Sequence, residues 1–153
     1  FVYTDFTLVF QVKVGREMSM SYKKMTDAYQ TTERSALVET EDSHQLVLVM
    51  FDALMKSIET YIDNIDVKKA DLELRSKHFS RALTIIYSLQ SSLDFEKGGE
   101  IADNLFQTYE FARQMIISSI KDMDETGPQR ALALLGEIRE AWAQMGENLN
   151  NEK

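Results

Sequence analysis

Two histidines and the carboxylates near them are the residues with the clearest capacity for chemistry. Di-iron sites in helical bundles place a Glu-x-x-His motif on each of two helices, because residues at that spacing share one helix face. Glu41 and His44 have this spacing, but His78 follows Arg75 instead of a carboxylate. Because the second motif is missing, we expect no metal site and no cofactor. His44 is interpreted as a surface residue in the first turn of a helix.

Nucleophilic and phosphate-binding chemistry have equally little support. A Ser-His-Asp triad is recognised by geometry, so composition alone leaves it open, but no strand-turn-helix elbow is present to expose a serine. The Gly98-Gly99 pair lacks the following Lys-Ser/Thr of a phosphate loop. Glutamates such as Glu137, Glu140 and Glu147 are most simply solvated helix faces. These residues therefore predict a protein that is not an enzyme.

Length and charge restrict the possible partners. The chain has 153 residues, which is typical of one domain that can form a core without disulfides, and it contains no Cys. Its formal charge of −8 repels phosphate backbones and anionic lipid surfaces, so nucleic acid is not expected as a direct partner. No apolar run approaches the roughly 18 residues that a membrane span needs. We therefore expect no membrane insertion.

The elements that would position any site are predicted to be four helices. One Pro and many helix formers favour an all-α protein. Asp42 and Gln45 form a capping box for the first helix, which closes near Asn64. The next two helices are predicted over about 69–93 and from the Gly98-Gly99 pair to about 123. The fourth runs from Pro128, a residue typical of a first helical position, to about 149.

Short connections between these helices predict an antiparallel up-down-up-down four-helix bundle over residues 43–149, with an N-terminal extension. The glycines at 98 and 99 would end the second helix and let the chain reverse. Because helices commonly end on a left-handed residue, we expect a positive φ at one of them at least.

The start of the chain follows a different pattern. Residues 4–14 alternate between apolar and polar side chains as a strand does, but no second run of this kind exists to pair with them. The segment lacks the basic start and small-residue cleavage site of a signal peptide. Disorder, pairing with a second copy in a homodimer, and docking on apolar bundle surface are the physical options, and we favour docking. Residues 1–17 are thus an extension of unknown role, followed by an N-terminal segment at 18–42.

The predicted helices carry more apolar residues than one bundle stripe requires. The first helix has two adjacent stripes, one containing Leu46 and Met50 and the other Phe51 and Leu54. Two interpretations are open. The helix could be a broad core helix, or its surplus could form an external groove for a partner's amphipathic segment.

Several stretches resemble the family of flagellin-specific export chaperones, FliS. The longest is SLQSSLDFEKGGEIADNLFQTYEF, at residues 88–111. HQLVLVMFDALMKSIE in the first helix and ALALLGEIREAWAQM in the last are similar to the corresponding family helices, and Tyr29-Gln30 and Thr40 match shorter family features. Ser43 replaces a usual Pro and Ala53 a frequent Gly, and a helix accommodates both.

This resemblance implies a cytoplasmic bundle that is not an enzyme. Members of the family bind the disordered C-terminal region of flagellin, prevent its premature polymerisation and deliver it to the flagellar type III export gate. Flagellin's amphipathic helices would then cover the surplus apolar surface, and the N-terminal segment would pack there when flagellin is absent.

The residues that we expect to contact the partner are apolar or aromatic and lie in the matched stretches: Tyr29, Leu46, Met50, Phe51, Leu54, Leu93, Phe95, Leu105, Phe106 and Tyr109. Some of them should prove to be core, with Leu46 and Leu105 the foremost candidates, and Trp142 is expected to be a core anchor. The alternative is a structural or regulatory bundle with a different protein partner.

Overall fold

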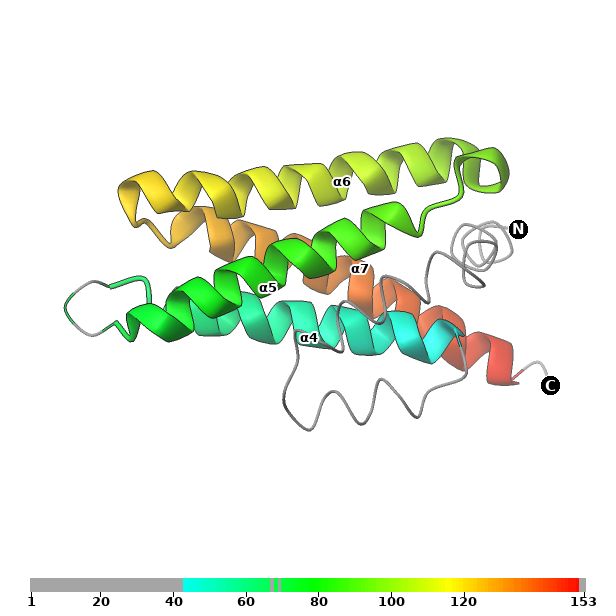
Figure 1. Ribbon diagram of the computed structural model, residues 1–153. Helices are drawn as coiled ribbons and strands as arrows, with labels where there is room; N and C mark the ends of the chain where they lie inside the picture. Colours follow the sequence, from blue (N-terminus) through cyan, green and yellow to red (C-terminus); the bar gives the residue numbers. More distant parts are fainter. Residues whose placement is uncertain (1–42, 67, 69, 152–153) are drawn as a thin grey trace.

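The computed structural model describes residues 43–66, 68 and 70–151, which form four helices (Figure 1). The helices are α4 (Ser43–Asp63), α5 (Leu72–Ser91), α6 (Phe95–Asp122) and α7 (Thr126–Asn151). They alternate in direction, so the predicted antiparallel up-down-up-down bundle is confirmed. The extension at 1–17 and the segment at 18–42, including Tyr29 and the capping residue Asp42, lie outside the described residues.

Each helix packs against two neighbours. α4 contacts α5 and α7, and α6 contacts the same two helices from the opposite corner. The α5–α6 pair makes the sparsest contact of the four adjacent pairs. These two helices separate towards the N-terminal end of α5, as Figure 1 shows. This separation leaves part of α5 and α6 without cover from a neighbouring helix.

The core takes both apolar stripes of α4. Leu46, Met50, Phe51 and Leu54 are all at most 9% exposed. They pack with Ile85, Ile86 and Leu89 of α5, Tyr109 and Ile116 of α6, and Leu135 and Trp142 of α7. A helix that faces two neighbours and a diagonal partner needs a wide apolar face. For α4, the interpretation as a broad core helix therefore holds.

The chain reverses between α5 and α6 earlier than the glycine pair predicts. α5 ends at Ser91, and the Ser92 hydroxyl donates to the carbonyl of Leu89 at 2.8 Å. The Asp94 carboxylate then accepts from the backbone N–H of Lys97 at 2.9 Å and caps α6. Side-chain caps at Ser92 and Asp94 thus make the turn, and the prediction that the glycines end the second helix is wrong.

The glycine pair lies inside the first turns of α6. Gly99 has φ 49° and ψ −126°, which kinks the helix after its first turn, so the predicted positive φ is confirmed. A Cβ built at Gly99 would have no heavy atom within 4 Å. Its backbone angles, and not a lack of space, therefore require glycine there.

The connection from α6 to α7 is also tight. Met123 ends α6 in the left-handed conformation, with φ 50°. The carboxylate of Asp124 accepts from the N–H of Thr126 at 2.9 Å and from its hydroxyl at 2.8 Å, and these bonds lower the pKa of Asp124. α7 therefore begins at Thr126, two residues before the predicted Pro128, which is still in the first turn and needs no N–H donor there.

His44 is not the surface residue that we expected. Its ring stacks on that of Trp142, with centroids 4.5 Å apart and planes 11° from parallel, and the Trp142 Nε1–H donates to the His44 carbonyl at 2.9 Å. A Cβ at Gly146 would collide with the His44 ring, so α7 approaches α4 closely at that point. Trp142 is 2% exposed, which confirms it as a core anchor that joins α7 to the first turn of α4.

Candidate functional site

Exposed large apolar side chains gather on α5 and α6. The six that the described residues expose all belong to these two helices: Leu72, Leu74, Tyr87, Phe95, Phe111 and Ile120. Tyr87 is 63% exposed and Phe95 is 45% exposed. Single exposed apolar residues are ordinary, but aromatic residues concentrated on one pair of helices are typical of a surface that binds a partner.

Polar contacts establish how the two helices face each other. The side-chain amide of Gln90, which is 8% exposed, donates to Glu110 Oε2 at 3.2 Å and to the carbonyl of Phe106 at 3.4 Å. Tyr87 lies one turn before Gln90 on the same face of α5. The surface that we call the α5–α6 seam is formed by Phe79, Tyr87 and Gln90 of α5 and by Phe95, Phe106, Glu110 and Ile120 of α6.

Glu110 is the charged group at the middle of this seam. Its carboxylate pairs with the guanidinium of Arg113 and accepts from the amide of Gln114 at 3.1 Å. The hydrogen bond from Arg113, the strongest influence, and those from Gln114 and Gln90 lower the pKa of Glu110 to about 2, although partial burial opposes them. Glu110 is therefore ionised near neutral pH, and Arg113 compensates its charge.

An aromatic pair closes the end of the seam near the α6 kink. The Phe95 and Phe106 rings meet edge to face, with centroids 5.9 Å apart. Phe106 also packs against the core, whereas Phe95 projects from the first turn of α6, before Gly99. The kink thus positions an exposed aromatic ring above a half-buried one.

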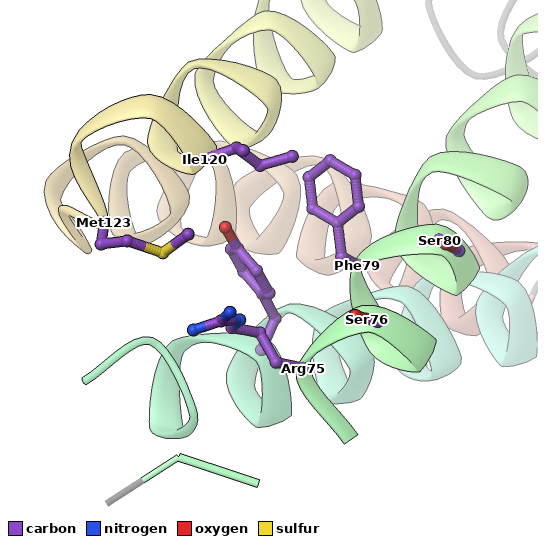
Figure 2. A pocket seen from close by; sticks show the side chains of 7 residues that line it. Arg75, Ser76, Phe79, Ser80, Ile120 and Met123 are labelled. Atoms are coloured by element: carbon purple, nitrogen blue, oxygen red, sulfur yellow. The ribbon is translucent and has the colours of Figure 1, made fainter. Parts of the chain in front are cut away.

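A pocket of about 230 Å³ lies at the opposite end, where α5 and α6 separate. Its lining comes from α4, α5 and the end of α6: Tyr61, Arg75, Ser76, Phe79, Ser80, Ile120 and Met123. In Figure 2 the side chains of Phe79 and Ile120 approach each other on one side, while Met123 and Arg75 lie on the other. The Tyr61 hydroxyl hydrogen-bonds with Ser119 Oγ at 2.7 Å, which joins α4 to α6 beside this pocket.

The residues predicted to contact a partner divide into two groups in the structure. Phe95 is exposed and Phe106 is half-buried, and both belong to the surface between α5 and α6. The other described ones lie in the core at 9% exposure or less: Leu46, Met50, Phe51, Leu54, Leu93, Leu105 and Tyr109. The structure therefore places two of these side chains where a partner could touch them without opening the bundle.

Sequence reasoning missed the pocket and Tyr87. Phe79 shares one face of α5 with Leu83 and Ile86, so helical periodicity gives no sign that it lines an opening. Tyr87 and Ile120 lie at the edges of the apolar faces of α5 and α6, and a large apolar side chain at such an edge is the sign that the sequence offers. The pocket depends on the separation of α5 and α6, which periodicity does not report.

Within the described part of the chain, no three His, Asp or Glu side chains form a group that could hold a metal ion. None of the four described helices has the length and apolarity needed to cross a membrane. What the fold and the seam define is a small helical bundle with an uncovered apolar surface along one helix pair.

Comparison with known proteins gives the family of this bundle. Residues 25–149 match the family described as "Flagellar protein FliS", and the chain belongs to that family. The match covers the whole bundle up to Leu149 and part of the N-terminal segment. The family is one of chaperones, which is not a class of enzymes.

Individual relatives agree with this assignment. The flagellar secretion chaperone FliS of Salmonella typhimurium is 29% identical over 119 residues, which are 77% of this chain and 87% of the relative. The protein of the same name from Vibrio cholerae is 26% identical over 125 residues, or 81% and 90% of the two chains. The flagellar secretion chaperone FliSB of Pseudomonas aeruginosa is 24% identical over 119 residues, or 78% and 93%.

Proposed function

We propose that this protein is a cytoplasmic export chaperone that binds the disordered C-terminal region of flagellin. By holding that region it prevents premature polymerisation, and it delivers flagellin to the flagellar type III export gate. The family match and the names of the relatives, each a flagellar secretion chaperone, support this function. The role is that of a binding protein, without a reaction to catalyse.

The observation that carries the proposal is the exposed aromatic surface of the α5–α6 seam. Tyr87 and Phe95 expose large ring surfaces on a chain whose formal charge is −8. An amphipathic helix can cover such a surface with residues at i, i+3, i+4 and i+7, and this burial drives the binding of a segment that folds only on its partner. A flagellin segment held in this way is not free to pack against other flagellin molecules.

The composition of the seam suits a helical occupant. Aromatic side chains supply contact area, while Glu110 is already paired with Arg113 and Gln90 already bonds across the seam. Around Glu110 a partner helix therefore meets apolar surface between satisfied polar groups, and covering Glu110 leaves its charge paired with Arg113. Of the residues predicted from the sequence, we propose that Phe95 and Phe106 contact the partner helix.

A titration with a peptide of flagellin's C-terminal region tests the proposal. Phe95→Asp places a carboxylate in the buried contact, and we expect binding to weaken about tenfold or more because an unpaired buried charge costs several kcal/mol. Phe111→Asp is the matched control. Phe111 is 48% exposed on the same helix, but it lies roughly 140° around the axis from Phe106.

Three outcomes of this titration are informative. Weak binding by the Phe95 variant alone supports the seam as the site. Equal weakening by both variants would contradict a site restricted to the seam. No binding by the unchanged protein would overturn the flagellin function and favour a bundle with a different protein partner, which co-purification would then identify.

Phe51 cannot serve in this test although it was among the predicted contacts. It is 0% exposed and lies 6.3 Å, ring centroid to ring centroid, from Tyr109. A charge there would unfold the bundle before it reported on binding. Circular dichroism of each variant therefore accompanies the titration, and only variants that keep the melting curve of the unchanged protein are compared.

A further inference from the structure

Arg75 carries a buried donor without an acceptor at the pocket. Its Nη1 atom is inaccessible to solvent and has no hydrogen-bond partner among the described residues. Arg75 lines the pocket beside Phe79 and Met123 (Figure 2). Buried donors are paired in the great majority of cases, so an orphaned guanidinium nitrogen at an opening calls for an acceptor from outside.

Two of the protein's carboxylates near this end, those of Asp71 and Asp124, bond to the starts of helices. Asp71 Oδ1 accepts from the N–H groups of Glu73 and Leu74 at the start of α5. Asp124 accepts from the N–H and hydroxyl of Thr126 at the start of α7. Both acids thus satisfy helix ends and leave the Arg75 nitrogen unpaired.

The pocket is large enough for one apolar side chain. Its volume is about 230 Å³, and a cavity of roughly 150 Å³ already admits benzene. Tyr61, Phe79, Ile120 and Met123 supply aromatic and aliphatic walls. A leucine or phenylalanine side chain matches both the size and the chemistry of this space.

We infer that the pocket is an anchor for a segment that carries a carboxylate beside a large apolar side chain. The apolar group enters the pocket beside Phe79 and Ile120, and the carboxylate accepts from Arg75. In a helical segment the two residues stand three or four positions apart, since these positions share a face. The assignment of this segment to flagellin's C-terminal region rests on the function proposed above. The match between the pocket and an acidic, apolar segment does not depend on that function.

The charge of the chain gives this pairing a role in selecting the partner's register. A chain with a net charge of −8 repels an acidic segment over most of its surface. A guanidinium at the anchor pocket favours a carboxylate at that position only. The register that brings the acid to Arg75 is therefore preferred over registers that place it against acidic surface.

A small probe tests the pocket without flagellin. The full chain is titrated with 3-phenylpropionate and with its uncharged counterpart 3-phenylpropanol, followed by the amide NMR signals of Ser76, Phe79 and Ile120. We expect both probes to shift these signals and the acid to bind about tenfold more tightly, because a charged hydrogen bond to Arg75 is added.

Two variants serve as controls for the titration with the small probes. Arg75→Met keeps the aliphatic stem, so the acid and the alcohol should then bind alike. Ser80→Phe fills the pocket from its rim and should abolish the shifts with either probe. An acid that binds no better than the alcohol, or shifts that Ser80→Phe leaves unchanged, would overturn the inference.

A second experiment measures how the same variants bind the flagellin C-terminal peptide. We expect Ser80→Phe and Arg75→Met each to weaken binding about tenfold, while the control Ser118→Phe, at an exposed serine of α6 outside the pocket, leaves it unchanged. Peptide binding that neither pocket variant weakens would contradict the anchor and leave the chaperone function intact. If the unchanged protein binds no peptide, the flagellin function fails and the probe titration still decides the pocket.

Discussion

Tyr109 has a hydroxyl group in the middle of the core with no partner among the described residues. The side chain is 0% exposed, and burial raises the pKa of its phenol well above the usual range. Its ring packs near Phe51, so the apolar part of the residue contributes to the core while the oxygen loses its hydrogen bonds to water. A buried polar atom in this state lowers the stability of the folded protein.

We predict that Tyr109→Phe stabilises the bundle by about 1 kcal/mol, because it removes the unsatisfied hydroxyl and keeps the ring. Urea unfolding followed by circular dichroism measures the change. Tyr87→Phe is the control, since Tyr87 is 63% exposed and its hydroxyl stays in water, and no change is expected there. A loss of stability in the Tyr109 variant would show that the hydroxyl has an acceptor in solution.

At the scale of the helices, the kink of α6 depends on the backbone conformation of one residue, Gly99. Its combination of φ 49° and ψ −126° is open to glycine and strained for other residues. The kink separates the rest of α6 from its first turn, which Asp94 caps and which carries the exposed Phe95. The end of the seam that contains Phe95 and Phe106 therefore lies next to this kink.

Gly99→Ala should destabilise the protein by about 1–3 kcal/mol through backbone strain alone, since a Cβ there meets no other atom. Gly136→Ala provides the contrast. Gly136 lies within α7, and its added Cβ would meet only the flexible end of Met55 at 3.3 Å, so the gain in helix propensity should make this change neutral or slightly stabilising. Equal effects in chemical denaturation would indicate that the kink relaxes.

The helices were predicted from the sequence more accurately than the turns between them. Apolar periodicity predicted all four helices, because a 3.6-residue repeat is a direct sign of a helix with one buried face. The short connections between them predicted their alternating directions. The turn before α6 was misplaced because the glycine pair suggested a stop, whereas Ser92 and Asp94 make the caps. Capping residues are common throughout the chain, so their role depends on where tertiary packing ends a helix.

At the scale of the whole molecule, the unequal packing of the four helices determines what remains uncovered. α4 is enclosed by its neighbours, and α5 and α6 separate towards one end (Figure 1). This explains why Phe51 and Leu54 proved to be core although the sequence suggested contact residues. Periodicity shows which residues share a face, and the distance between helices decides whether that face is open. Phe95 and Phe106 were predicted as partner contacts from the family resemblance. Arg75 and Tyr87 were not among the predicted contacts.

A deletion of residues 1–17 tests whether the start of the chain competes for the partner's site. The alternation over residues 4–14 predicts an extended segment with one apolar face, and docking on the bundle is the arrangement that we favour for it. If it occupies the site half of the time, its removal should tighten flagellin binding about twofold, since apparent affinity scales with the open fraction. An unchanged affinity in a titration of the shortened chain against the full chain would argue against competition.

The stacking of His44 on Trp142 gives the molecule a spectroscopic consequence. The chain contains one tryptophan, and it is 2% exposed against the first turn of α4. Its fluorescence emission therefore comes from one position, the junction where the described bundle meets the segment that precedes it. A ligand that enters the pocket at the other end of α4 should leave this emission unchanged. A partner that displaces the first turn of α4 should shift the emission to longer wavelength, which separates the two modes of binding without any added label.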